Sequence, residues 1–111
     1  EVLKALGHFI HTHVRASDIA CRFGGEEFAI IMPDSSIEDA GRRADNLIEG
    51  VRTMSIHHGG VTLPAITLSI GVSAFPEHGG TSEELLSAAD HALYRAKESG
   101  RDRVCLEVTA V

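Results

Sequence analysis

The chain has 111 residues, of which 43% are hydrophobic and 23% charged, a composition typical of one small soluble domain over residues 1–111. Its net charge of −6 argues against a DNA or RNA partner, because surfaces that follow a nucleic-acid backbone are usually basic. Two cysteines, Cys21 and Cys105, are too few for a disulfide framework. No apolar run approaches the roughly 18 residues of a membrane span, and no signal peptide is visible.

The first part of the chain predicts a helix followed by a β-hairpin. Residues 1–14 have apolar residues at helical spacing, and no capping residue precedes them, so we expect a chain cut within or just before a helix. Residues 18–23 and 28–32 are apolar runs on either side of Gly24-Gly25, which is typical of a hairpin with a tight turn.

Two capping boxes, at residues 35–38 and 81–84, each predict the start of a helix. We expect the helices to extend to about residue 53 and about residue 99. Their apolar stripes predict the faces that pack on the core. In the first helix these residues are Ile37, Ala40, Ala44, Leu47, Ile48 and Val51, and in the second they are Leu85, Leu86, Ala89, Ala92, Leu93 and Ala96.

The segments around these helices predict further strands. Residues 55–63 are expected to form a loop, whereas residues 65–75 are β-branched and apolar and predict a buried strand. Gly71 within that strand indicates a close approach of another backbone or a bulge. Gly100 fits a left-handed position just past the second capped helix, and residues 104–108 predict a final strand.

This order of helices and strands predicts the fold class. Helix, strand, strand, helix, strand, helix and strand alternate along the chain, so we expect an α/β (α+β) sandwich. Its helices flank a mostly antiparallel central sheet.

The hairpin tip, Gly24-Gly25-Glu26-Glu27, is the first candidate for chemistry. Glycines let a bulky ligand approach the main chain, and adjacent carboxylates repel each other unless a cation or solvent relieves them. Divalent cations such as Mg²⁺ are held by one or two carboxylates together with substrate phosphates. The tip therefore fits a metal-bound triphosphate, and the plainer alternative is a solvated turn with two exposed acids.

Two cations at the end of the second capped helix form another candidate. Lys97 lies in the last helical turn and Arg101 just past it, so both side chains can reach one phosphate group. The alternative is that these cations only interact with the negative end of the helix dipole.

Four motifs together resemble one family. Residues 22–28, 67–72, 89–97 and 100–104 are similar to the GGEEF, TxSIGV, ADxALYxAK and GRNRV motifs of GGDEF-family diguanylate cyclases, in the family's order and spacing over residues 1–108. Asp102 stands where the family usually has asparagine, and we expect this difference to alter a local turn contact rather than the chemistry. The resemblance implies a nucleotidyl-cyclase or palm-like fold with the N-terminal part of the domain missing.

The resemblance implies an enzyme that condenses two GTP molecules to cyclic di-GMP and pyrophosphate across a homodimer. It assigns Glu26 as a ligand of Mg²⁺ (or Mn²⁺) and as the base for the attacking 3′-hydroxyl. Glu27 would lie close to the metals and is also required for catalysis. Gly24 and Gly25 would let the nucleotide lie against backbone. Lys97 and Arg101 would hold the triphosphate.

Arg15 and Asp18 lie in register with the RxxD site at which the family binds cyclic di-GMP as an allosteric inhibitor. By resemblance, Arg15 contacts guanine or phosphate and Asp18 contacts the guanine edge. A further arginine from the following helix could be Arg42 or Arg43, and the sequence leaves this choice open. The alternative is an ordinary loop arginine next to an aspartate at the start of a strand.

The sequence does not contain the family's DxDxFKxxND segment, which supplies another metal-binding aspartate and the asparagine that binds guanine. We therefore expect this chain alone to be inactive or nearly so, and the preference for GTP over ATP stays open. The resemblance also implies a cytoplasmic domain joined to an N-terminal sensory domain. The alternative function is a non-catalytic regulatory module that binds cyclic di-GMP or GTP, although the presence of Glu26 and Glu27 favours an enzyme.

Overall fold

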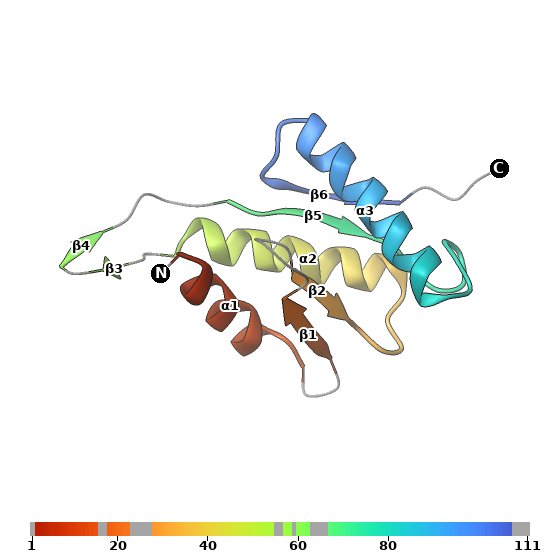
Figure 1. The fold of residues 1–111 in the computed structure, drawn as a ribbon, viewed down its shortest axis with the longest axis horizontal. Coiled ribbons are helices and arrows are strands. Elements are labelled where there is room, and N and C mark those ends of the chain that lie inside the picture. Colours follow the sequence, from red (N-terminus) through yellow and green to blue (C-terminus); the bar gives the residue numbers. More distant parts are fainter. Residues whose placement is uncertain are drawn as a thin grey trace.

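A computed structural model describes residues 2–15, 18–22, 28–54, 57–58, 60–62 and 67–107 (Figure 1). The elements in chain order are α1 (Val2–His13), β1 (Ile19–Arg22), β2 (Phe28–Ile31), α2 (Ile37–Arg52), β3 (His57–His58), β4 (Val61–Thr62), β5 (Ser69–Val72), α3 (Ser82–Glu98) and β6 (Arg103–Leu106). Within these residues, no helix is both long and apolar enough to cross a bilayer.

The strands form three pairs within the described residues. β1 and β2 are antiparallel with Arg22 opposite Phe28, and β3 and β4 are also antiparallel. β5 and β6 are parallel with Ser69 opposite Arg103, and α3 is the crossover between them. Figure 1 shows α2 in the middle of the molecule. Helix α1 and the β1–β2 hairpin lie on one side of α2, and β5, β6 and α3 lie on the other. The predicted α+β class is therefore confirmed, and two of the three strand pairs are antiparallel.

One predicted capping box is correct and the other is wrong. Thr81 caps α3, since its Oγ1 accepts a hydrogen bond from the Glu84 backbone N–H at 3.1 Å. For α2 the cap is Ser36, whose Oγ accepts from the Asp39 N–H at 3.1 Å, and not the predicted Ser35. Ser35 instead directs its hydroxyl to the Pro33 carbonyl at 3.4 Å, so the helix begins one residue later.

The predicted loop over residues 55–63 is wrong in part, because β3 and β4 pair within it. The predicted strand over residues 65–75 is shorter, since β5 covers Ser69–Val72 and residues 65–66 lie outside the described part of the chain. The final strand begins at Arg103, one residue earlier than expected, and ends at Leu106.

The predicted face of α2 contributes more buried hydrophobic residues than any other described element. Two core clusters lie along it. The first core cluster contains Leu6, Ile10 and Val51, and the second contains Ala40, Ala44 and Val72. On α3, Ala92 and Ala96 are buried as predicted, but Leu86 is 44% exposed, which corrects the inward position expected for it. The reason is that α3 contacts β5 along a narrow stripe of small residues, and Leu86 lies beside that stripe.

Gly71 is the point at which α3 meets β5. A Cβ atom placed on Gly71 would lie 2.1 Å from the Ala89 carbonyl oxygen and 2.2 Å from the Leu93 backbone nitrogen. The close backbone approach predicted from the sequence is therefore confirmed, and only glycine fits this contact.

Candidate functional site

The proposed catalytic tip, Gly24-Gly25-Glu26-Glu27, lies outside the described residues. The two strands that carry it are described, and their register places Arg22 opposite Phe28. The tip is thus part of the connection from Arg22 to Phe28, at the turn end of the β1–β2 pair.

The core clusters show which end of the molecule the start of β2 occupies. Ile30 of β2 and Leu68, just before β5, both pack on the first core cluster, near the C-terminal end of α2. Two residues later in each segment, Met32 and Ile70 pack on the second core cluster, nearer the start of α2. β2 and β5 therefore run in the same direction along α2, and the start of β2 at Phe28 lies toward the C-terminal end of that helix.

The turn after α3 places the two predicted phosphate ligands. The Gly100 N–H donates to the Lys97 carbonyl at 3.4 Å and the Arg101 N–H donates to the Ala96 carbonyl at 2.9 Å. These two bonds are a Schellman motif, in which Gly100 has the positive φ of 120° that the sequence predicted for it. The motif fixes the backbone of Arg101 relative to the last turn of α3, where Lys97 lies.

This turn lies at the same end of the molecule as the start of β2. Arg103 pairs with Ser69 at the start of β5, so β6 and β5 begin at one end. Arg52, the last residue of α2, donates from Nε to Oδ1 of Asp102 at 3.0 Å. The strand that follows the acidic tip and the turn that carries Arg101 therefore both start toward the C-terminal end of α2.

Lys97 and Arg101, the two predicted phosphate ligands, are called the phosphate-binding pair below, after the role that the sequence predicts for them. Both side chains are exposed, and in the described part of the chain neither forms a hydrogen bond or an ion pair. Two unneutralised cations four residues apart across a rigid turn can both contact a polyphosphate.

The predicted RxxD residues form a closed turn before β1. The Asp18 N–H donates to the Arg15 carbonyl at 3.0 Å, and the Arg15 N–H donates to Oδ2 of Asp18 at 2.7 Å. Asp18 has a side chain only 2% exposed and forms an ion pair with Arg43 of α2. The hydrogen bond from Arg43 holds the pKa of the Asp18 carboxyl below its usual value.

The Arg15 side chain belongs to a second, exposed ion-pair group. Its Nη2 contacts Oδ2 of Asp39 at 3.2 Å, and Oδ1 of Asp39 binds Arg42. The hydrogen bonds from Arg42 and from Arg15 hold the pKa of the Asp39 carboxyl below its usual value. The sequence left open whether Arg42 or Arg43 accompanies Arg15. The structure distinguishes them, because the Arg43 side chain is 16% exposed and paired with Asp18, whereas the Arg42 side chain is 69% exposed and shares Asp39 with Arg15.

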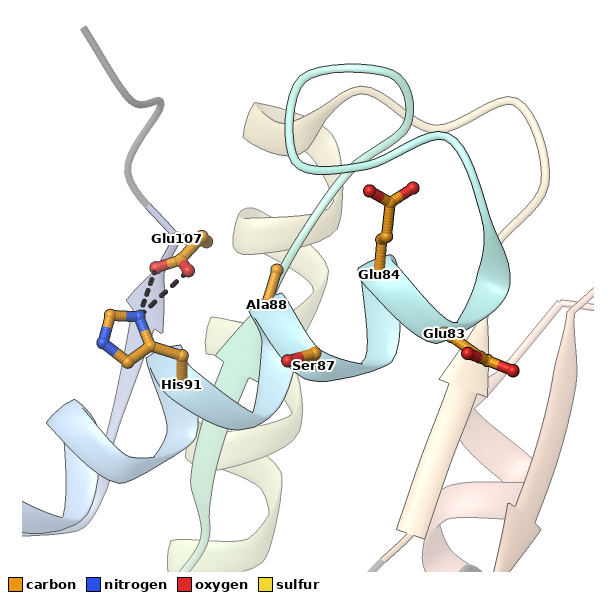
Figure 2. Close-up of a pocket in the computed structure, with 6 residues that line it drawn as sticks. All are labelled: Glu83, Glu84, Ser87, Ala88, His91 and Glu107. Carbon is orange, nitrogen blue, oxygen red and sulfur yellow. Dashed lines mark hydrogen bonds and ion pairs between the residues drawn. The ribbon is translucent and has the colours of Figure 1, made fainter.

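A shallow pocket of about 480 Å³ lies elsewhere, on the first half of α3 (Figure 2). It is lined by Glu83, Glu84, Ser87, Ala88, His91 and Glu107. His91 Nδ1 lies 3.0 Å from Oε2 of Glu107. Three glutamates make this pocket unfavourable for a phosphate group. Along the helix its lining residues lie from about 9 Å to about 21 Å from Lys97. Neither Lys97 nor Arg101 lines this pocket, so it is distinct from the candidate nucleotide site.

The sequence did not single out two residues that form ion pairs near the predicted site residues. They are Asp39, which binds Arg15, and Arg52, which binds Asp102. The spacing of Asp39 and Arg42, three apart on a helix, is a local signal that could have indicated their pairing. Arg52 and Asp102 are 50 residues apart, and no sequence pattern connects them.

The family profile described as "Diguanylate cyclase, GGDEF domain" matches residues 1–103. The chain is similar to the response regulator PleD of Caulobacter vibrioides (strain NA1000 / CB15N), with 44% identity over 106 residues that cover 94% of this chain and 23% of PleD. It is 38% identical over 104 residues to the diguanylate cyclase DgcP of Pseudomonas aeruginosa, covering 94% of this chain and 15% of DgcP. The chain therefore spans less than a quarter of the length of these two relatives.

Two solved structures share the fold. The GGDEF domain of PA1120 (YfiN or TpbB) from Pseudomonas aeruginosa has a TM-score of 0.88 and 37% identity, covering 98% of this chain and 68% of that one. The GGDEF domain of DgcB from Caulobacter crescentus, in complex with c-di-GMP, has a TM-score of 0.86 and 28% identity, covering 96% of this chain and 63% of that one.

Proposed function

The chain belongs to the GGDEF diguanylate cyclase family, and from this premise we propose that it holds the triphosphate and part of the metal shell in a domain that joins two GTP molecules into cyclic di-GMP. The observation that carries the proposal is the phosphate-binding pair, which has no partner among the described residues and lies at the end of the molecule where β2 starts. Cations for phosphate and carboxylates for metal are the two groups that phosphoryl transfer needs.

In this proposal each residue has a defined task. Lys97 and Arg101 bind the β- and γ-phosphates, and the glycines of the tip let the nucleotide approach the backbone. Glu26 accepts the proton of the attacking 3′-hydroxyl, and Glu27 supplies a second carboxylate. These carboxylates suit Mg²⁺ or Mn²⁺, which when bound would neutralise charge that develops on the α-phosphoryl group.

The reaction needs two nucleotides, so we propose a homodimer with two facing sites. Each 3′-hydroxyl attacks the α-phosphorus of the other GTP in line, and pyrophosphate leaves. Holding both nucleotides head to tail makes the encounter of the two reactants effectively unimolecular. In this proposal the domain works in the cytoplasm and takes its input from an N-terminal sensory domain.

The phosphate-binding pair provides the test of this function. The assay uses a longer chain, defined as this sequence preceded by the rest of the family's full-length domain, including its DxDxFKxxND segment. Lys97→Ala or Arg101→Ala should each raise the KM for GTP about tenfold, since losing one charge-assisted contact costs roughly 1.4 kcal/mol.

The measurement is the steady-state rate of formation of cyclic di-GMP, with the product identified by mass. Lys4→Ala, which removes an exposed lysine of α1, is the matched control and should leave KM within twofold. An unchanged KM in both variants of the phosphate-binding pair would remove the basis of the proposal. Binding of GTP without turnover by the longer chain would instead favour the non-catalytic regulatory module.

We further propose that cyclic di-GMP inhibits the enzyme by binding at Arg15. The complex of the related DgcB domain with c-di-GMP supports a ligand of this kind. Arg15 and Arg42 both present exposed guanidinium groups, so they would bind phosphate or guanine. Asp18 would hold the turn through Arg43, and a ligand would reach its carboxylate only after that pair rearranges.

Arg15→Ala should relieve this inhibition. In the longer chain we expect the inhibition constant for cyclic di-GMP to rise at least tenfold, because the ligand loses its charged contact from Arg15. The initial rate at low product should stay within twofold. The measurement is the rate at increasing added cyclic di-GMP, and an inhibition curve that does not move would contradict the assignment.

A further inference from the structure

The backbone around Arg101 is held by several hydrogen bonds. Its N–H donates to the Ala96 carbonyl at 2.9 Å, and its own carbonyl accepts from Arg103 Nε at 3.0 Å. The next residue, Asp102, is held by Arg52. The guanidinium of Arg101, unlike its backbone, has no partner in the described part of the chain.

This turn has an unfavourable conformation that something must stabilise. Arg101 has φ of 62° and Asp102 has φ of 50°, so two consecutive non-glycine residues are left-handed after Gly100. Each such residue costs roughly 1–2 kcal/mol, although aspartate tolerates the region better than most. An isolated segment with this sequence would relax out of that conformation.

The Arg52–Asp102 bridge supplies the missing stabilisation. Arg52 donates from Nε to both carboxylate oxygens of Asp102, at 3.0 and 3.2 Å, and from Nη2 to the Asp102 carbonyl at 3.2 Å. One guanidinium therefore fixes both the side chain and the main chain of Asp102. The hydrogen bond to Asp102 also holds the pKa of Arg52 above its ordinary value.

Arg52 does not have the contacts expected of a phosphate ligand. Its Nη1 binds Glu49 on the same helix, and its remaining donors described above are directed to Asp102. A phosphate would have to displace two carboxylates from it. The Arg101 guanidinium, by contrast, is unpaired as far as the described residues extend.

We propose that Arg52 and Asp102 are positioning residues for nucleotide binding: the bridge locks the left-handed turn so that Arg101, together with Lys97, is directed at the triphosphate of the nucleotide. The inference rests on the proposed function and deepens it. It assigns a role to the end of α2, which the motifs of the sequence did not include. It also gives Asp102 a purpose that its local sequence does not reveal.

A double-mutant cycle on the longer chain tests the proposal. Asp102→Ala should raise the KM for GTP three- to fivefold with kcat within twofold, because Arg101 is no longer held toward the phosphates. In an Arg101→Ala background the same change should alter KM by less than 1.5-fold, since there is no guanidinium left to position. A residue that only stabilises the fold would lower the melting temperature in both backgrounds without this dependence on Arg101.

Two further variants and a matched control keep the test decisive. Asp102→Asn retains tolerance of the left-handed region and an acceptor for Arg52, so KM should stay within twofold. Arg52→Lys keeps the charge but loses the multidentate contact, so it should raise KM two- to threefold even if Asp102→Ala does not fold. Glu49→Gln removes the other carboxylate bound to Arg52 and is the matched control, with KM within 1.5-fold.

The outcomes separate this inference from the function on which it rests. If Lys97→Ala and Arg101→Ala both leave KM unchanged, the proposed function itself fails. If only Arg101→Ala leaves KM unchanged, Arg101 does not bind the nucleotide and the positioning role is overturned. If Arg101→Ala raises KM but Asp102→Ala and Arg52→Lys do not, the positioning role alone is overturned. An equal rise in KM from Asp102→Ala with and without Arg101 would also overturn it, because the effect would then not pass through Arg101.

Discussion

This chain alone should form no measurable cyclic di-GMP from GTP and Mg²⁺, whereas the longer chain should turn over. The expected difference is at least roughly a thousandfold, because metal stabilisation and placement of the nucleotide each contribute several kcal/mol to such reactions. By resemblance to the family, Glu26 and Glu27 supply only part of the carboxylates that hold the metals. By resemblance to the family, the remaining metal aspartate and the guanine-binding asparagine belong to the segment that this sequence does not contain.

The measurement is chromatographic separation of products after a long incubation with both chains at equal concentration. In the longer chain, Glu26→Gln or Glu27→Gln should reduce the rate to the level of the short chain, since each removes a carboxylate at the metals. Glu38→Gln, an exposed glutamate in the first turn of α2, is the matched control and should be active. Substantial product from the short chain would show that this sequence already holds a sufficient metal site.

Gly71→Ala should strongly destabilise the fold. The added Cβ would lie 2.1 Å from the Ala89 carbonyl oxygen and 2.2 Å from the Leu93 nitrogen, and both are backbone atoms that no side-chain rotation can move. Helix α3 would have to shift away from β5, so we expect a loss of about 3 kcal/mol or more in the free energy of unfolding. That is a large part of the stability of a domain of this size.

Thermal unfolding followed by circular dichroism measures this effect. A loss of about 3 kcal/mol corresponds to a fall of roughly 12–24 °C in the melting temperature of a domain of about 100 residues. Gly80→Ala is the matched control, because the nearest atom to its Cβ, an oxygen of Glu84, lies 4.0 Å away. We expect that variant to melt within about 2 °C of the parent. Equal melting temperatures for the two variants would contradict a direct contact between α3 and the backbone of β5.

The local features of this protein could be predicted from its sequence because they depend on neighbours a few residues apart. The buried stripe of α2, the Thr81 cap and the positive φ of Gly100 all follow from helical spacing or from the stereochemistry of one residue. Gly71 also belongs here, since a glycine inside a β-branched strand indicates a close contact even when the partner is unknown. The Ser35 cap was wrong because two serines in a row compete for one position.

The pairings between distant residues were decided only by the tertiary structure. Asp18 meets Arg43 across 25 residues and Arg52 meets Asp102 across 50, and single charged residues at such separations have no periodicity that would reveal a partner. The parallel direction of β5 and β6 likewise depends on how α3 crosses between them. Residue types and helical spacing thus determined which cations are candidates for binding phosphate, whereas the packing of α2 against β5 and β6 determined which of these cations have a carboxylate partner among the described residues.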